Sequence, residues 1–360
     1  MKIYSKIIWV PIVAAITLVM SVPAVGKVAV FVSIIPQKYF VQQIGKNLVD
    51  IQVLVQPGAN PAIYEPRPRQ MAAMAKTQLY LSIGVPFENV WLNKIASSNP
   101  NMMVVQTDHG IQKASMVDHH HHDKAADHQK TDQQHNNEGG HDEKRRNTGI
   151  RDPHIWLSPP LVMIQARTMA TTLQTVDPAH RSDYEDNYKA FISEISKLDT
   201  ELKNIFSGNH GLQFMVFHPA WGYFADTYGL KQIPVEIEGK NPKPAQLKSL
   251  IEFANTNDID VIFVQPQFSA KSAEVIARGI GGQVVVADPL ALDWPANLRK
   301  VGREIKVMRF DNRLVHVGLL PSLMKLYTIR YHIEKYLTAE IIKFFFFGDL
   351  CCELLCFFHD

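Results

Sequence analysis

Histidine is the residue type in this sequence that points most directly to chemistry, because imidazole is the commonest protein ligand for zinc and related ions. Eight histidines fall between His109 and His141. Four are consecutive: His119, His120, His121 and His122. A run of this kind is either a purification tag or a metal-collecting segment. A tag normally sits at a terminus, whereas this run is internal and continues irregularly, so we interpret it as native.

Three further residues of metal-ligand type stand after the His-rich segment or at the ends of apolar runs. His154 lies in the segment Asp-Pro-His-Ile-Trp, His218 directly follows the run 212–217, and Asp288 follows the run 284–287. Ligands of open α/β sheets bind beyond the carboxyl ends of the strands. Two imidazoles and one carboxylate suit Zn²⁺ or Mn²⁺. Each residue taken alone also has an ordinary structural explanation, such as a surface histidine or an Asp-Pro turn.

Cysteine takes no part in this chemistry over most of the chain. The three cysteines, Cys351, Cys352 and Cys356, all lie in the last ten residues. Residues 27–350 therefore offer no thiolate, and any metal there must be held by histidine, carboxylate or water. A body without disulfides is stabilised by its apolar core and by its ligand.

The elements that must position these residues alternate along the chain in two series. The expected strands of the first series are 28–34, 51–55, 79–83 and 102–106, and its expected helices are 36–46, 68–75 and 87–96. The second series has strands at 212–217, 232–237, 261–264 and 284–287, and helices at 221–228, 244–257, 270–279 and 295–307. Strands that alternate with helices predict parallel sheets covered on both faces.

Two helices, 159–176 and 178–206, separate the two series. In the second helix, apolar residues recur every three or four positions and form one stripe. Its ~28 residues would span roughly 40 Å, long enough to run along two lobes. We therefore predict an α/β protein of two lobes, each a parallel sheet flanked by helices, joined by a long rigid helix. The predicted divisions are a signal peptide (1–26), an N-terminal lobe (27–176), a linking helix (177–207), a C-terminal lobe (208–307) and a tail of unknown role (308–360).

Segment 108–150 interrupts the first lobe and is rich in His, Asp, Gln, Asn and Lys. A segment with so few apolar residues does not offset its ordering entropy by burial, so we predict a disordered loop. Long loops inside a domain are usually functional or disordered, and this one fits both descriptions.

The N-terminus predicts export. Lys2 and Lys6 precede an apolar run, and the small residues Ala24 and Gly26 follow it, which is the pattern of a cleavable secretory signal. The alternative is an uncleaved membrane anchor, because the run is rather long. No cysteine lies near the cleavage point to carry a lipid, so we expect a soluble protein of the periplasm. The net charge of +2, with no basic cluster, argues against nucleic acid as a partner.

Several short motifs in order resemble one known family. They are GANPAIYEPRP (58–68), DPHIWLSP (152–159), HPAWG (218–222), VQPQFS (264–269) and DPL (288–290). Together they are similar to the substrate-binding proteins of zinc ABC transporters, the ZnuA-like type among the cluster A-I metal-binding proteins. That family also carries a His-rich loop just before DPHIW. The resemblance implies a monomeric protein that holds metal in the cleft between two lobes and delivers it to a membrane permease.

Carried over residue by residue, the resemblance implies His154, His218 and Asp288 as metal ligands. One position departs from the family pattern, because Pro-Ala stands at 61–62 where the family usually has Pro-His. Water, Glu65 or a loop histidine such as those at 119–122 are the candidates to complete the site. The missing imidazole weakens the case for zinc over manganese, whereas the His-rich loop favours zinc.

Two other functions fit parts of the pattern. A zinc hydrolase would also use three protein ligands and an open water position, but the sequence has no His-Glu-x-x-His, Gly-x-Ser-x-Gly or phosphate-loop motif, so we expect no enzyme. A periplasmic zinc buffer or a metal-dependent adhesin could use the same fold without a permease. The lack of a lipid-anchoring cysteine argues against an adhesin tethered to the surface.

Overall fold

The structure, a computed structural model, describes residues 26–116, 151–237 and 239–316 of the 360-residue chain, with side chains as far as residue 306. The predictions for the signal peptide, for His119–His122 and for most of the tail therefore lie outside the described residues. The chain divides into two compact units, Met1–Ile305 and Lys306–Asp360. The features below belong to the first unit, except that helix α10 (Trp294–His316) continues into the second.

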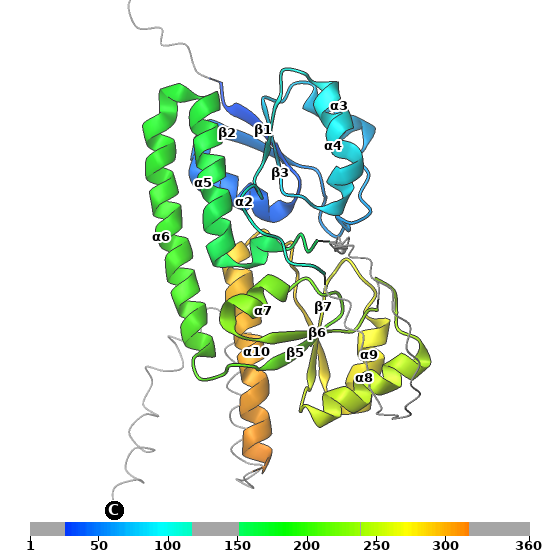
Figure 1. The fold of residues 1–360 in the computed structure, drawn as a ribbon. Helices are drawn as coiled ribbons and strands as arrows, with labels where there is room; N and C mark the ends of the chain where they lie inside the picture. Colours follow the sequence, from blue (N-terminus) through cyan, green and yellow to red (C-terminus); the bar gives the residue numbers. More distant parts are fainter. Residues whose placement is uncertain (1–25, 117–150, 238, 317–360) are drawn as a thin grey trace, which may run out of the picture. The chain divides into compact units, whose positions relative to one another are not determined.

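The first sheet has four parallel strands in the order β2-β1-β3-β4. The strands are β1 (Val28–Val32), β2 (Val49–Val53), β3 (Leu79–Ser82) and β4 (Met103–Gln106). The central strands β1 and β3 are almost wholly buried, whereas the edge strands expose part of their side chains. This is the burial pattern of a sheet covered on both faces. The connecting helices are α2 (Ile35–Gly45), α3 (Pro68–Met74) and α4 (Pro86–Ser98) (Figure 1).

The second sheet repeats this arrangement in the order β6-β5-β7-β8. Its strands are β5 (Gln213–Val216), β6 (Lys231–Pro234), β7 (Val261–Val264) and β8 (Gln283–Val286), and its helices are α7 (Gly222–Tyr228), α8 (Pro244–Thr256) and α9 (Lys271–Ile280). Met215 and Ile262 on the central strands pack in one apolar cluster with Leu250 of α8 and Ile276 of α9. Because side chains alternate along a strand, Phe214 and Phe263 face the other side, where their rings contact each other.

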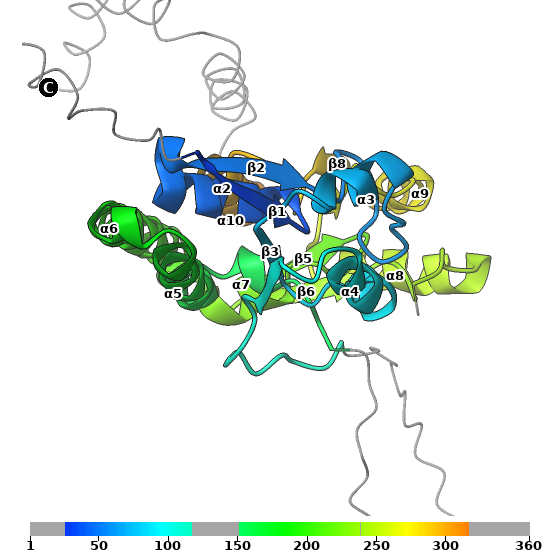
Figure 2. The ribbon, with the colours of Figure 1, turned by 90° about the horizontal axis from the view of Figure 1, so that it is seen from above.

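The predicted linking helix is one of a pair. Helix α5 (Pro159–Val176) and helix α6 (Arg181–Phe206) pack along each other and lie side by side in both views (Figures 1 and 2). Helix α6 begins three residues later than predicted, because Pro178–His180 form a separate 3₁₀ turn. Its apolar stripe contacts both lobes. Phe191 lies against Tyr39 and Phe40 of α2, and Phe206 lies against Phe224 of α7.

Two buried tryptophans connect the lobes a second time. The indole Nε1–H of Trp156 donates to the carbonyl oxygen of Pro289 at 2.7 Å, and that of Trp294 donates to the carbonyl oxygen of Trp156 at 2.7 Å. Trp294 opens helix α10 (Trp294–His316), and its ring also contacts Phe40 edge to face. Buried indole donors are normally paired, and this pairing fixes the segment after His154 to the segment after Asp288.

The two-lobed α/β architecture predicted from the sequence is confirmed. Most predicted boundaries lie within two residues of the observed ones, but α10 continues to His316, past the predicted end of the C-terminal lobe at 307. In the part of the chain that the structure describes, no helix is both long and apolar enough to span a membrane.

Candidate metal site

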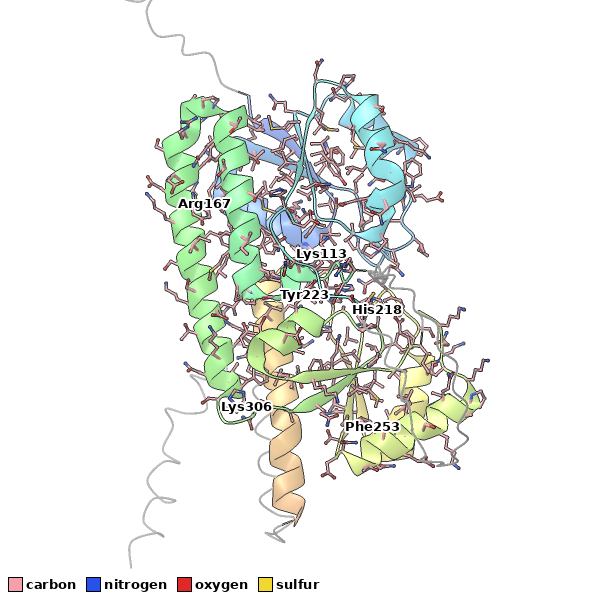
Figure 3. All side chains as sticks on the ribbon, viewed as in Figure 1. Lys113, Arg167, His218, Tyr223, Phe253 and Lys306 are labelled. Carbon is pink, nitrogen blue, oxygen red and sulfur yellow. The ribbon has the colours of Figure 1, made fainter. Side chains whose placement is uncertain are left out.

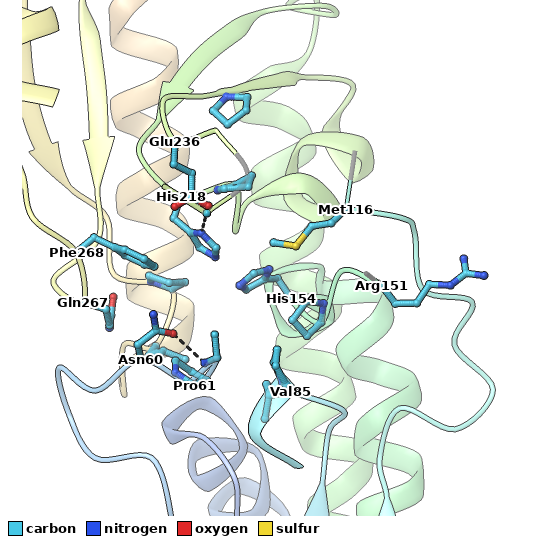
Figure 4. Close-up of a pocket in the computed structure, with 18 of the residues that line it drawn as sticks. Asn60, Pro61, Val85, Met116, Arg151, His154, His218, Glu236, Gln267 and Phe268 are labelled. Atoms are coloured by element: carbon cyan, nitrogen blue, oxygen red, sulfur yellow. Dashed lines mark hydrogen bonds and ion pairs between the residues drawn. The ribbon is translucent and has the colours of Figure 1, made fainter. Parts of the chain in front are cut away.

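A cavity of about 1020 Å³ opens where the carboxyl ends of strands from both sheets approach each other. Its lining includes His154 and His218, together with Asn60, Pro61 and Ala62 of the loop after β2. The two imidazoles face each other across this space (Figure 4). Two of the three ligands predicted from the sequence thus lie in one cavity, at the location expected for a parallel sheet.

A carboxylate holds the imidazole of His154. The ring Nδ1–H donates to Asp152 Oδ1 at 2.7 Å, and the same oxygen accepts the backbone N–H of His154 at 2.9 Å. Both residues are buried, with exposed fractions of 8% and 6%. A carboxylate only accepts hydrogen bonds, so Nδ1 carries the proton and the lone pair is on Nε2. That is the tautomer a metal ligand needs.

The backbone of this segment is anchored from the other lobe. Tyr223 of α7 (labelled in Figure 3) donates its hydroxyl hydrogen to the carbonyl oxygen of Asp152 at 3.0 Å and accepts the backbone N–H of Ala114 at 2.9 Å. Burial, with the charge of Asp152 as a smaller cause, raises the pKa of Tyr223 to about 12. The hydroxyl therefore stays protonated and able to donate at neutral pH.

A second carboxylate holds the imidazole of His218. The ring Nδ1–H donates to Glu236 Oε1 at 2.6 Å, a contact drawn as a dashed line in Figure 4. The backbone of His218 exchanges two hydrogen bonds with the side-chain amide of Gln265, and the ring of Phe268 stacks on the imidazole with centroids 4.7 Å apart. The ring plane is thereby fixed, and Nε2 is again the atom with the free lone pair.

The separation of the two rings matches what a shared metal ion requires. Their centroids lie 5.3 Å apart with planes at 70°. A zinc ion about 2.0–2.1 Å from each Nε2, with a tetrahedral angle between them, would place the centroids roughly 5 Å apart. The spacing of the two imidazoles is therefore compatible with one shared ion.

The third predicted ligand, Asp288, lies beside the cavity rather than in its lining. Its Oδ1 accepts the side-chain N–H of Gln267 at 2.9 Å and the backbone N–H of Leu290 at 3.0 Å. Over residues 26–116, 151–237 and 239–306, no group of three or more His, Cys, Asp or Glu side chains is placed to hold a metal ion. A role for Asp288 as a ligand stays a prediction.

Ala62, where the family has histidine, and Glu65, a candidate to complete the site, differ in position. Ala62, the residue that departs from the family pattern, lines the same cavity as the histidine pair. Glu65 is exposed and does not belong to the lining. Met116 and Arg151, the described residues on either side of the His-rich segment, do line the cavity. Arg151 also forms an isolated antiparallel bridge with Ser115.

The carboxylate partner of His218 was missed by sequence reasoning. Glu236 stands in the apolar stretch Ile233–Ile237 and is 8% exposed. An acidic residue in an otherwise apolar strand end is the signal that could have identified it, because a buried carboxylate needs a partner. Asp152 was within a recognised motif, but its hydrogen bond to His154 was not predicted.

Comparisons with known proteins match most of this chain. Residues 30–306 match the family model described as ZnuA, zinc-uptake complex component A, periplasmic. The high-affinity zinc uptake system protein ZnuA of Bacillus subtilis is 28% identical over 270 residues, which are 73% of this chain and 79% of that protein. The iron-binding protein YfeA of Yersinia pestis is 25% identical over 247 residues, 67% of this chain and 70% of that protein.

Solved structures of ZnuA are also similar to this chain. A crystal structure of ZnuA is 40% identical, with a TM-score of 0.69, and the match covers 78% of this chain and 99% of that chain. A zinc-bound deletion mutant of ZnuA is also 40% identical, with a TM-score of 0.67 and coverage of 78% and 97%.

Proposed function

This chain belongs to the ZnuA family of periplasmic zinc-uptake components, and we propose that it captures zinc between His154 and His218 and delivers it to the permease of an ABC-type importer. Proteins of this family bind solutes and are not enzymes. Manganese or iron is the alternative cargo, since the relative from Yersinia pestis is named for iron. The expected location of this protein is the periplasm.

One observation carries the proposal. His154 and His218 come from different lobes, each Nδ1 is held by its own carboxylate, and the rings are 5.3 Å apart. Metal-binding histidines usually donate their second ring N–H to a carboxylate or carbonyl, which fixes the ring and raises its basicity. A surface histidine that binds no metal does not require a buried carboxylate to orient its ring, whereas each of these two histidines has one.

Metal binding is tested on the metal-stripped full chain. A ligand that binds only the folded state stabilises it, so zinc should raise the melting temperature in proportion to the logarithm of its concentration above Kd. Manganese and iron(II) tested in parallel establish the preference. A melting temperature that no divalent metal shifts would refute the proposal.

Delivery is tested in cells that lack this protein and grow with a zinc chelator. We expect the intact gene to restore growth, and a gene with His154→Ala and His218→Ala together to fail although the protein is exported at the same level. If the gene for the double variant restored growth, the contribution of the protein to growth would not depend on the cleft site.

A further inference from the structure

Met116 brings a sulfur atom into the cavity that contains the two histidines. It belongs to the lining of that cavity, together with His154 and His218. In the close-up, its thioether points from the cavity wall towards the two imidazoles (Figure 4). A sulfur atom and two imidazole nitrogens therefore share one space.

The backbone that leads to Met116 is bonded to the segment that carries His154. Ala114, two residues before Met116, donates its backbone N–H to the hydroxyl of Tyr223 at 2.9 Å and accepts the backbone N–H of Asp152 at 2.9 Å. Asp152 in turn orients the ring of His154. The thioether and this imidazole are thus carried by two segments that are hydrogen-bonded to each other.

The carboxylates that hold the two imidazoles lie on the side of each ring away from Nε2. Asp152 and Glu236 bind the Nδ1 atoms. A carboxylate bound at Nδ1 is directed away from an ion on Nε2 of the same ring. Asp108, the other acidic residue of the described lining, forms an ion pair with Lys113 at 2.7 Å. Ala62 adds only a methyl group, so the donor that the cavity wall turns towards the imidazoles is the thioether of Met116.

These donor types do not favour the same metals. Zinc in proteins takes thiolate sulfur, imidazole nitrogen and carboxylate oxygen, and thioether sulfur is not among its usual ligands. Imidazole also suits copper, and the soft thioether selects the monovalent ion, Cu(I). The methionine side chain is flexible and polarizable, so it can adjust to an ion that the two imidazoles already hold.

We propose that the cleft is also a Cu(I) site, in which Nε2 of His154, Nε2 of His218 and Sδ of Met116 coordinate one ion. All three donors are neutral, and the carboxylates of Asp152 and Glu236 behind the rings balance the charge of the ion. This inference rests on the histidine pair of the proposed function and adds a softer metal to it. Copper is bound as Cu(I), with no change in its oxidation state.

X-ray absorption at the copper edge tests the proposal on the full chain, loaded with one equivalent of Cu(I) under anaerobic conditions. The cysteines are first replaced by Cys351→Ser, Cys352→Ser and Cys356→Ser, because thiolates also select Cu(I). We expect a coordination shell that contains both imidazole nitrogen and sulfur. Only methionine supplies sulfur in this background.

A pair of variants in the same background assigns the sulfur. Met116→Leu keeps an apolar side chain of similar volume and should lose the sulfur shell. Its Cu(I) affinity, measured by competition with a chromophoric Cu(I) chelator, should fall at least roughly tenfold, because loss of even an outer partner of a metal ligand typically costs 10–100-fold. Its zinc affinity should fall by a smaller factor. Met103→Leu is the matched control, since Met103 on β4 is exposed and outside the cavity, and it should behave like the parent.

The outcomes separate the copper site from the zinc function beneath it. A Cu(I) spectrum without sulfur, or equal Cu(I) affinities of Met116→Leu and Met103→Leu, would overturn the copper site and leave zinc capture intact. Cu(I) binding that is as tight in the double variant His154→Ala with His218→Ala as in the parent would also overturn it, because the ion would then lie elsewhere. Failure to bind either zinc or Cu(I), by protein that circular dichroism shows to be folded, would contradict both proposals.

Discussion

The imidazoles of His154 and His218 lie 5.3 Å apart although 63 residues separate them in the chain and each follows a different sheet. Each is oriented by a buried carboxylate from its own side, Asp152 or Glu236. The spacing therefore depends on the relative placement of two rigid supports. The buried tryptophan contacts at Trp156 and Trp294 tie those supports together near the site.

Replacement of both histidines, His154→Ala with His218→Ala, should abolish tight zinc binding. The cavity would then keep no imidazole nitrogen among its described lining residues. Competition against a zinc-sensitive dye measures the effect, and His210→Ala serves as the control because His210 is exposed and lies outside the cavity. Submicromolar zinc binding by the double variant would show that the site lies elsewhere.

Removal of the carboxylate behind His218 should weaken zinc binding without removing a ligand. Loss of an outer hydrogen-bond partner of a metal-binding histidine typically costs roughly 10–100-fold in affinity, and we expect this range for Glu236→Ala. Isothermal titration with zinc measures it. Glu274→Ala on α9 is the matched control, since Glu274 is exposed and outside the cavity. Equal affinities of the two variants would mean that Glu236 does not support the site.

Deletion of residues 118–141 should lower the total zinc bound but keep the cleft site. The reason is that His154 and His218, the two imidazoles in the cavity, both lie outside the deleted residues. Metal analysis after dialysis gives the total, and dye competition gives the tight site. Loss of all binding on deletion would place the tight site in the segment rather than the cleft.

The buried carboxyl of Glu88 should make stability depend on pH. Burial raises its pKa above the ordinary 4.5, although Ser33 and the backbone N–H groups of Ile83 and Gly84 donate to it. A carboxyl with a raised pKa in the folded state contributes stability below pH 4.5 and loses it as the pH rises through the folded value.

Glu88→Gln removes this titration, so its unfolding free energy should improve relative to the parent as pH rises from 4 towards 7, by ~1.4 kcal/mol for each unit by which the pKa is raised. Urea unfolding at several pH values measures the difference. The absolute stability of the variant is secondary, because its amide also changes the hydrogen bonds. A difference that is constant with pH would contradict the raised pKa.

The sequence predicted the layers of this fold well because its signals are local. Continuous apolar runs such as Val261–Val264 and prolines at helix starts such as Pro159 do not depend on distant contacts. His218 was found because it stands at the end of such a run, and His154 because it lies in the segment Asp-Pro-His-Ile-Trp just after the His-rich segment. Both long helices were predicted, but only the second was assigned as a link between the lobes, since the packing of α5 on α6 is a tertiary property.

The contacts between neighbouring strand ends were harder to predict. Glu236 reaches His218 because β5 and β6 pair in parallel, with Val216 opposite Pro234, so that the residues after both strands meet at one edge. Asp288 has the right type and place in the chain, yet its position depends on hydrogen bonds to Gln267 and Leu290 that no local pattern encodes. The position of a residue in the sequence predicts at which edge of the sheet it lies, but it does not predict which way its side chain points.

Anomalous diffraction at the zinc edge, from crystals of the zinc-loaded full chain, tests the central claim most directly. We predict one peak in the cleft, about 2.0–2.1 Å from both His154 Nε2 and His218 Nε2. A strong peak elsewhere, with both of these nitrogens free of metal, would contradict the claim that the two imidazoles form the site.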